Sequence, residues 1–172
     1  MRKLLTLLFV ICSFVSATAQ PPMEAPAELK SLAWMVGTWE GKMSMDIEGM
    51  KMESKTTMKC AMEGMFLRQD FIMEAEGMKM TEVGYLGWDA EKKKYSMYTF
   101  ASWAPTPRIE WGEIKGNDFV SISEPWASGM PEKTVSRATL KKVSDGEVSF
   151  LLEFKMGDKW TKVGTGTFKK KA

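Results

Sequence analysis

The chain has 172 residues, 44% of them hydrophobic and 27% charged, which is typical of one packed domain and excludes a disordered or collagen-like chain. It contains no histidine, so Ser-His-Asp triads, Cys-His dyads, His-ligated haem and His-containing zinc sites are all excluded. The formal net charge is only +2 and the one basic block is Lys169-Lys170-Lys171, so we expect neither nucleic acid nor an anionic membrane surface as a partner.

The N-terminal segment has the pattern of a secretory signal peptide. Arg2 and Lys3 precede an apolar run over residues 4–15, and small residues supply a cleavage site after Ala19. The apolar run is shorter than the roughly 20 residues that a membrane-spanning helix needs, and no later run is as apolar, so we expect no membrane span. We divide the chain into a signal peptide (1–19), a flexible tail (20–27) and a folded domain (28–172), and expect a periplasmic or secreted protein.

A short helix is predicted before the first strand. Over residues 27–35 the side chains of Leu29, Leu32 and Met35 recur near helical spacing, and Gly37 ends the helix after two to three turns. From residue 38 the period changes to two, and hydrophobic residues alternate with charged ones as far as residue 47. This alternation predicts a strand with one buried and one solvated face.

Two hairpins with the same sequence phrase follow. Glu-Gly-Met-Lys-Met stands at 48–52 and again at 76–80, with each Glu-Gly pair as the turn. About ten short strands with short loops favour an all-β fold, an antiparallel up-and-down barrel with a short N-terminal capping helix, because closure also removes exposed sheet edges. The later strands are predicted at 95–103, 108–115, 119–123, 134–143, 148–156 and 160–169.

The turns of such a barrel lie alternately at its two ends, so they form two rims. One rim is mostly charged and also receives the helix, and we expect it to be closed. The other rim is rich in Met and Trp, and we expect it to be the mouth of a cavity. The turns of the mouth are those at 48–49, 76–77, 104–107, 125–131 and 157–158.

Several phrases resemble known barrel proteins. Gly37-Thr38-Trp39 resembles the Gly-x-Trp signature of lipocalin-like barrels. With the phrases at 84–89 and 165–168, residues 29–169 resemble a bacterial family of unknown function whose expected fold is similar to the ten-stranded nitrobindin-like barrels. This resemblance implies a barrel with an internal cavity and places Trp39 against the closed end. Nitrobindin-like proteins hold haem through a histidine that this chain lacks, so haem is not implied and no cofactor is expected.

The mouth and the inward strand positions supply a candidate ligand site. Trp103 and Trp126 lie beside prolines in mouth loops, and each combines an apolar face with an N–H donor. Glu82 falls at an inward position where a carboxylate needs a partner, for which Arg137 is the candidate; a register that places both in solvent is the alternative. We expect a small apolar or amphipathic ligand in this cavity. The candidate binding residues are Met45, Met52, Met73, Met80, Glu82, Trp103, Trp126 and Arg137.

Two other functions stay open. Thioethers are soft ligands suited to Cu(I), so a periplasmic copper protein is one alternative. Unbranched methionine also fills irregular apolar space, so the main hypothesis includes no metal. A structural or interaction module with a filled core is the other alternative, for which no protein partner is predicted. No catalytic spacing is present and Cys60 has no histidine to activate it, so no enzyme activity is predicted. The candidate Cu(I) ligands are Met50, Met52, Met78 and Met80.

Overall fold

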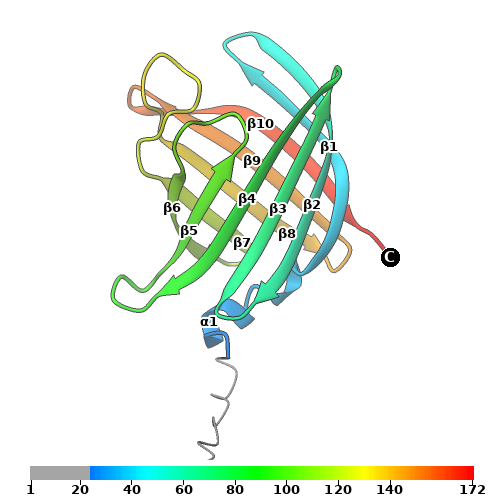
Figure 1. Cartoon of the computed structure of the whole chain (residues 1–172), viewed down its shortest axis with the longest axis vertical. Helices are drawn as coiled ribbons and strands as arrows, with labels where there is room; N and C mark the ends of the chain where they lie inside the picture. The colour runs from blue at the N-terminus through cyan, green and yellow to red at the C-terminus, as the bar shows by residue number, and fades with distance from the viewer. Residues whose placement is uncertain (1–23) are drawn as a thin grey trace, which may run out of the picture.

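Ten antiparallel strands in chain order close into a barrel in the computed structural model, which describes residues 24–172 (Figure 1). Because β1 pairs with β10, the sheet has no free edge. The predicted all-β, antiparallel up-and-down barrel with a short N-terminal helix is confirmed, whereas the predicted signal peptide lies outside the described residues. The elements are α1 (Ala27–Lys30), the 3-10 helix η1 (Ala33–Met35), β1 (Gly37–Ile47), β2 (Met50–Glu63), β3 (Phe66–Ala75), β4 (Met78–Asp89), β5 (Lys94–Ala101), β6 (Arg108–Lys115), β7 (Asp118–Ser123), β8 (Ser136–Ser144), β9 (Glu147–Met156) and β10 (Lys159–Lys170).

The two Glu-Gly hairpins have the same turn geometry. Glu48 and Gly49 have φ angles of 53° and 84°, and Glu76 and Gly77 have φ angles of 48° and 81°. A two-residue turn with positive φ at both central positions has the twist that suits the flanking strands. The repeated phrase therefore builds two similar hairpins, β1–β2 and β3–β4, whose tips lie at the same end of the barrel (Figure 1).

The opposite end of the barrel is closed by the N-terminal segment (Figure 1). Leu29 and Leu32 are fully buried there together with Phe168 of β10. Trp39, at the start of β1, is 1% exposed, and its Nε1 donates a hydrogen bond of 2.8 Å to the carbonyl oxygen of Met35. The rim at which the sequence pattern placed the helix is thus filled by an apolar core.

The prediction of one continuous helix over residues 27–35 is wrong. The α-helical hydrogen bonds end at Ser31, and the amide of Leu32 donates to Leu29 rather than to Glu28. The hydroxyl of Tyr95 donates to the carbonyl oxygen of Glu28 at 2.8 Å, so a barrel side chain takes the place of the next helical donor. A helix this short depends on tertiary packing, and here packing against the barrel breaks it into one α turn and one 3-10 turn.

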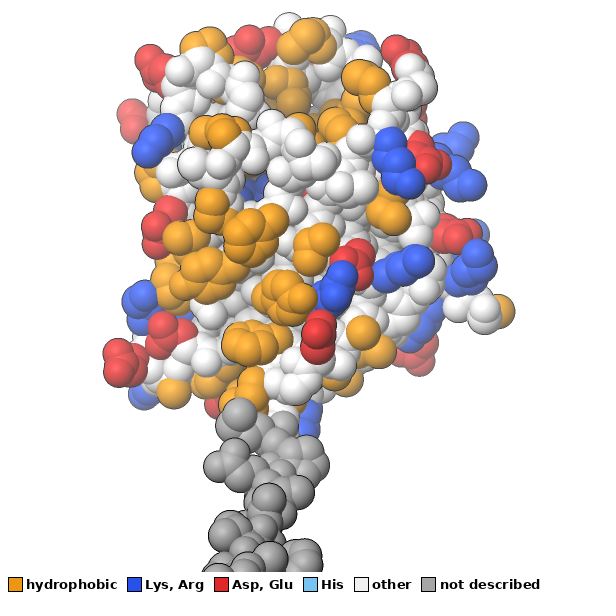
Figure 2. All heavy atoms as spheres, in the orientation of Figure 1, with side chains coloured by type: hydrophobic (Ala, Val, Ile, Leu, Met, Phe, Trp, Pro, Cys, Tyr) orange, Lys and Arg blue, Asp and Glu red, His pale blue; other side chains and the backbone are white. Residues whose placement is uncertain are grey.

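The outer wall carries hydrophobic side chains where β4, β5 and β6 lie side by side. Figure 2 shows them gathered on this face. The strand register places outward-facing Val83 beside Phe100 and Tyr85 beside Tyr98, and Phe100 and Tyr98 are exposed. None of the helices among residues 24–172 is long and apolar enough to cross a membrane.

Candidate ligand site inside the barrel

A cavity of about 290 Å³ lies inside the barrel and is lined by inward-facing side chains of all ten strands. The α1 and η1 segments cover one end of the barrel, and the Met- and Trp-bearing turns surround the other. A water molecule occupies about 30 Å³ in the liquid, so the cavity has about ten times that volume. Its size therefore suits a small organic molecule.

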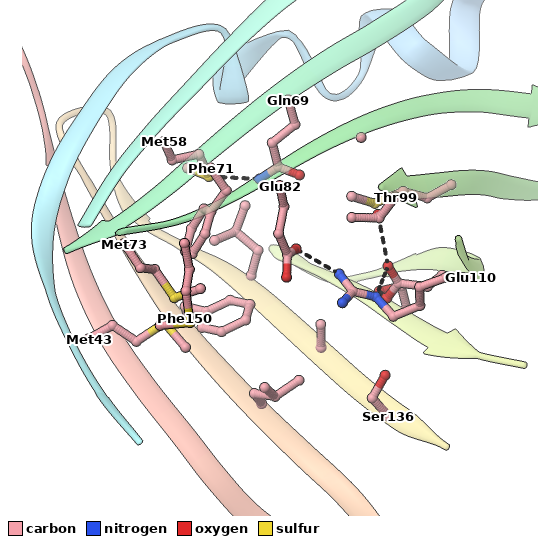
Figure 3. Close-up of a pocket in the computed structure, with 18 of the residues that line it drawn as sticks. Met43, Met58, Gln69, Phe71, Met73, Glu82, Thr99, Glu110, Ser136 and Phe150 are labelled. Atoms are coloured by element: carbon pink, nitrogen blue, oxygen red, sulfur yellow. Dashed lines mark hydrogen bonds and ion pairs between the residues drawn. The ribbon is translucent and has the colours of Figure 1, made fainter. Parts of the chain in front are cut away.

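One wall of the cavity is apolar and rich in sulfur. Adjacent strands place Met45 opposite Met52 and Met73 opposite Met80, and all four side chains line the cavity. Phe71 joins them, and Figure 3 shows its ring near the side chains of Met43, Met73 and Phe150 on one side of the cavity. Flexible thioethers adapt to the shape of an apolar ligand, so this wall suits a hydrocarbon body.

The facing wall carries a cluster of charged side chains from β4 and β6 (Figure 3). Arg108 Nη2 lies 3.0 Å from Glu82 Oε2, and Arg108 Nε lies 3.0 Å from Glu110 Oε2. Ser121 donates to Glu110 Oε1 at 2.9 Å, and Thr99 lies 3.5 Å from Glu110 Oε2. We call Glu82, Arg108 and Glu110 the charged cluster.

The side chains of the charged cluster are 3–16% exposed, and each charged group is paired with an opposite charge inside the cluster. Glu110 is 2% exposed, so its carboxylate depends on the hydrogen bonds of Arg108 and Ser121. Burial by itself would lower the pKa of Arg108, but the charges of Glu110 and Glu82 and the hydrogen bonds to them raise the pKa above its usual value. The guanidinium therefore stays charged inside the barrel.

Two tryptophans from the mouth loops cover the charged cluster. The rings of Trp103 and Trp126 lie 5.4 Å apart, and the guanidinium carbon of Arg108 lies 5.0 Å from the ring centre of Trp126. The backbone of Trp126 forms an isolated bridge with Thr134, which fixes the second loop. Within residues 24–172, Trp126 Nε1 is buried without a hydrogen-bond acceptor, which is unusual for a buried donor.

Most of the predicted binding residues come together, and one does not. Seven of the eight line the cavity, whereas Arg137 faces the outside of β8. Its Nε lies 2.6 Å from Glu153 Oε2, and its guanidinium lies over the ring of Trp160. The predicted pair of Glu82 with Arg137 is therefore wrong, because inward and outward positions alternate along β8 and Arg108 occupies the place beside Glu82.

The four candidate Cu(I) ligands are divided between two environments. Met52 and Met80 line the cavity, whereas Met50 and Met78 stand at the hairpin tips with 71% and 56% of their surface exposed. Among the residues described, no three Cys, Asp or Glu side chains are grouped so that they could hold a metal ion.

Cys60 is not part of the site. It is buried in β2 with 5% of its surface exposed, near the closed end. Burial, and to a smaller extent the charge of Asp70, raises the pKa of its thiol to about 12 from an ordinary value of 9.0. The thiol is thus protonated at neutral pH.

Sequence reasoning missed Arg108, Glu110 and Ser121. In β6 the two hydrophobic residues Ile109 and Trp111 alternate with Arg108 and Glu110, a pattern that predicts the charged residues outside. The structure has the opposite arrangement. The signal that could have revealed this arrangement is Gly112. Its missing side chain leaves room for the ring of Phe119, which points inward. Gly112 therefore marks the even-numbered positions of β6 as the inner face.

The chain is similar to known proteins in sequence and in structure. A family model described as "Protein of unknown function (DUF1579)" matches residues 24–170. The crystal structure of Rv2717c from M. tuberculosis is similar with a TM-score of 0.68 and 15% sequence identity, and the match covers 87% of this chain and 100% of that chain. At this identity the likeness shows the fold alone. No curated protein matches the chain.

Proposed function

The chain belongs to the DUF1579 family of proteins of unknown function, and we propose that it binds a small amphipathic molecule inside its barrel. The observation that carries the proposal is a cavity with two unlike walls, one of Met and Phe side chains and one with the charged cluster and hydroxyl groups. A ligand with an apolar body and one polar group matches both walls. Apolar burial supplies affinity at about 25 cal/mol per Å², and the polar group supplies orientation.

The ligand enters and leaves through the end that carries Trp103 and Trp126. The opposite end is filled by Leu29, Leu32 and Trp39, which are 0–1% exposed. Trp103, with 38% of its surface exposed, reaches from the solvent to the cavity. A change in the tryptophan fluorescence of the protein is therefore expected when the cavity is occupied.

We also propose that the protein acts outside the cytoplasm. The pattern of residues 1–19 supports this, because a basic start, an apolar run and a small-residue site together direct secretion. Expression of the full chain followed by intact-mass measurement of the exported protein tests it. A mass beginning at Gln20 is expected, and retention of residues 1–19 on a cytoplasmic product would contradict it.

A pair of adjacent substitutions on β8 tests ligand binding. Ala138 lines the cavity, whereas Thr139 points outward. We expect Ala138→Phe to fill the cavity and abolish binding, and Thr139→Phe, the matched control, to leave binding unchanged. Native mass spectrometry of residues 20–172 purified from the expressing cell would detect an organic mass that is lost on denaturation and missing from Ala138→Phe.

The outcome separates the proposal from its alternatives. A co-purifying organic mass in the wild type and in Thr139→Phe but not in Ala138→Phe supports the proposed function. A protein that carries no organic mass and takes up none of a panel of small amphiphiles would have a filled or purely structural core. Stoichiometric uptake of Cu(I) under reducing conditions, lost on changing Met52 and Met80 to Leu, would replace the proposal with metal binding.

A further inference from the structure

The cavity holds three formal charges, and their sum is negative. Among the described residues that line it, Glu82 and Glu110 each carry a carboxylate and Arg108 carries a guanidinium. The other lining side chains are uncharged. An anionic ligand would therefore meet a net charge of the same sign inside a small cavity, where charges are poorly screened.

Arg108 is not free to act as the counter-ion of an anionic ligand. It makes contacts of 3.0 Å with Glu82 through Nη2 and with Glu110 through Nε, so a carboxylate lies on each side of it. The side chains of Arg108, Glu82 and Glu110 are only 16%, 14% and 3% exposed. An incoming carboxylate would have to displace one of these buried partners, which would leave that partner unpaired.

The wall of the cavity nevertheless contains a hydrogen-bond donor that has no acceptor among the described residues. Trp126 is 5% exposed and lines the cavity, and its Nε1 is the buried donor that lacks an acceptor within residues 24–172. A neutral oxygen, such as that of a ketone, an ester or an alcohol, can accept this hydrogen bond without bringing a charge. Such a group also leaves the charged cluster intact.

We infer that the barrel selects uncharged amphiphiles with an oxygen acceptor for Trp126 Nε1 and rejects the corresponding carboxylates. This inference rests on the proposed function. It specifies the polar group of the ligand: the apolar body lies against the Met and Phe wall, and the neutral oxygen lies toward Trp126.

Three probes of nearly equal size test the selectivity. 2-Nonanone, octanoate and octylammonium each have nine or ten non-hydrogen atoms, and each is a small amphiphile of the kind proposed for a cavity of about 290 Å³. Binding to residues 20–172 is measured at pH 7.5 by tryptophan fluorescence and calorimetry. We expect 2-nonanone to bind and octanoate to bind about 100-fold more weakly, because like charges brought together disfavour binding strongly. Octanoate binding as tightly as 2-nonanone would overturn the inference while leaving the proposed function in place. Octylammonium binding as tightly as 2-nonanone would do the same, because an ammonium group is charged and has no acceptor for Trp126 Nε1. Failure of all three to bind would overturn both.

Two substitutions, one inside the cavity and a matched control outside it, test whether the charge of the cavity causes the discrimination against octanoate. Glu82→Gln makes the charged cluster neutral and is expected to raise the affinity for octanoate, relative to the affinity for 2-nonanone, at least tenfold. Glu153→Gln changes the same charge in the outer pair with Arg137, at 2.6 Å, and should alter neither affinity. Equal effects of the two variants would mean that the net charge of the protein, not the cavity, controls selection.

Trp126→Phe tests the donor directly. The ring is largely kept and the N–H is lost, so we expect the affinity for 2-nonanone to fall about tenfold. Thermal unfolding of each variant checks that the barrel is intact. An unchanged affinity of folded Trp126→Phe for 2-nonanone would remove the assigned donor and overturn that part of the inference.

Discussion

The two ends of the barrel are built on different principles. At the closed end, Leu29, Leu32 and Trp39 are 0–1% exposed, and Trp39 Nε1 has an acceptor at 2.8 Å. At the open end, Trp126 Nε1 has no acceptor within the described residues, and buried carboxylates lie beside the cavity. The difference indicates that the closed end supplies stability, and the open end keeps unsatisfied and charged groups that packing alone does not require.

The largest expected effect compares two tryptophans. Trp39 is buried at the closed end and does not line the cavity, whereas Trp126 is buried and lines it. Trp39→Ala should lower the free energy of unfolding by about 3–5 kcal/mol, because it creates a new void in a filled core. Trp126→Ala should lower it by clearly less, because it enlarges a cavity that already exists. Urea unfolding of residues 20–172 measures both, and equal losses would contradict the proposed division between the ends.

The next effect concerns the charged cluster. Arg108→Met leaves the buried carboxylate of Glu110 without its ion pair and should lower the free energy of unfolding by about 3–5 kcal/mol. Replacing Glu82 by Leu and Glu110 by Leu in the same chain should recover most of that loss, since an apolar substitute for a whole buried cluster is often neutral. A triple variant no more stable than Arg108→Met would show that the cluster stabilises the fold instead of serving a ligand.

A smaller effect separates the two buried tryptophans. Trp39→Phe removes a hydrogen bond and leaves the carbonyl of Met35 without its donor, so it should cost about 1–3 kcal/mol beyond the loss of ring volume. Trp126→Phe removes an N–H that has no acceptor and should cost only the ring volume. Urea unfolding of both variants measures the two losses, and we expect the larger loss for Trp39→Phe. A larger loss for Trp126→Phe would contradict the proposal that the closed end supplies most of the stability.

The smallest expected effect concerns Cys60, which is the one cysteine in residues 20–172. With a pKa of about 12, Cys60 in the folded protein should not react measurably with a disulfide reagent at pH 8, whereas the unfolded chain should react at once. The thiol of the unfolded chain loses its proton near the ordinary pKa of 9.0, whereas the folded protein holds it up to a pKa of about 12. The ionisation of Cys60 therefore lowers the free energy of unfolding as pH rises from about 9 to 12. Reaction of the native protein at the rate of a free thiol would show that the closed end opens.

The sequence predicts the architecture well because the signal is repeated. The first strands alternate clearly between hydrophobic and polar residues, and turn residues mark most hairpins, so the strand order and the closed rim follow from chain order alone. The two Glu-Gly phrases even predict the same turn twice, and both turns have positive φ at both positions. Alternation and turn residues are local features of the sequence, and in these parts of the chain the local preferences agree with the final fold.

The polar half of the site could not be predicted in this way. In β6 the inner face carries Arg108 and Glu110, and the outer face carries Ile109 and Trp111, which reverses the usual pattern. The partners that make this arrangement stable are Glu82 of β4 and Ser121 of β7, and their contacts with β6 are visible only in three dimensions. For the same reason the sequence pattern wrongly pairs Glu82 with Arg137, a residue that faces the other side of the wall.

The closure of the barrel by the first and last strands orders events during protein synthesis. Trp39 pairs with Lys170, and the amide of Lys171 donates to Thr38 at 2.7 Å, so the seam joins both ends of the sequence. A ribosome adds about 5–20 residues per second, and β1 therefore exists for roughly 6–25 s before its partner strand has been made. Until then the edge of β1 and the whole interior are open, and a chain that stops short of β10 cannot become a barrel.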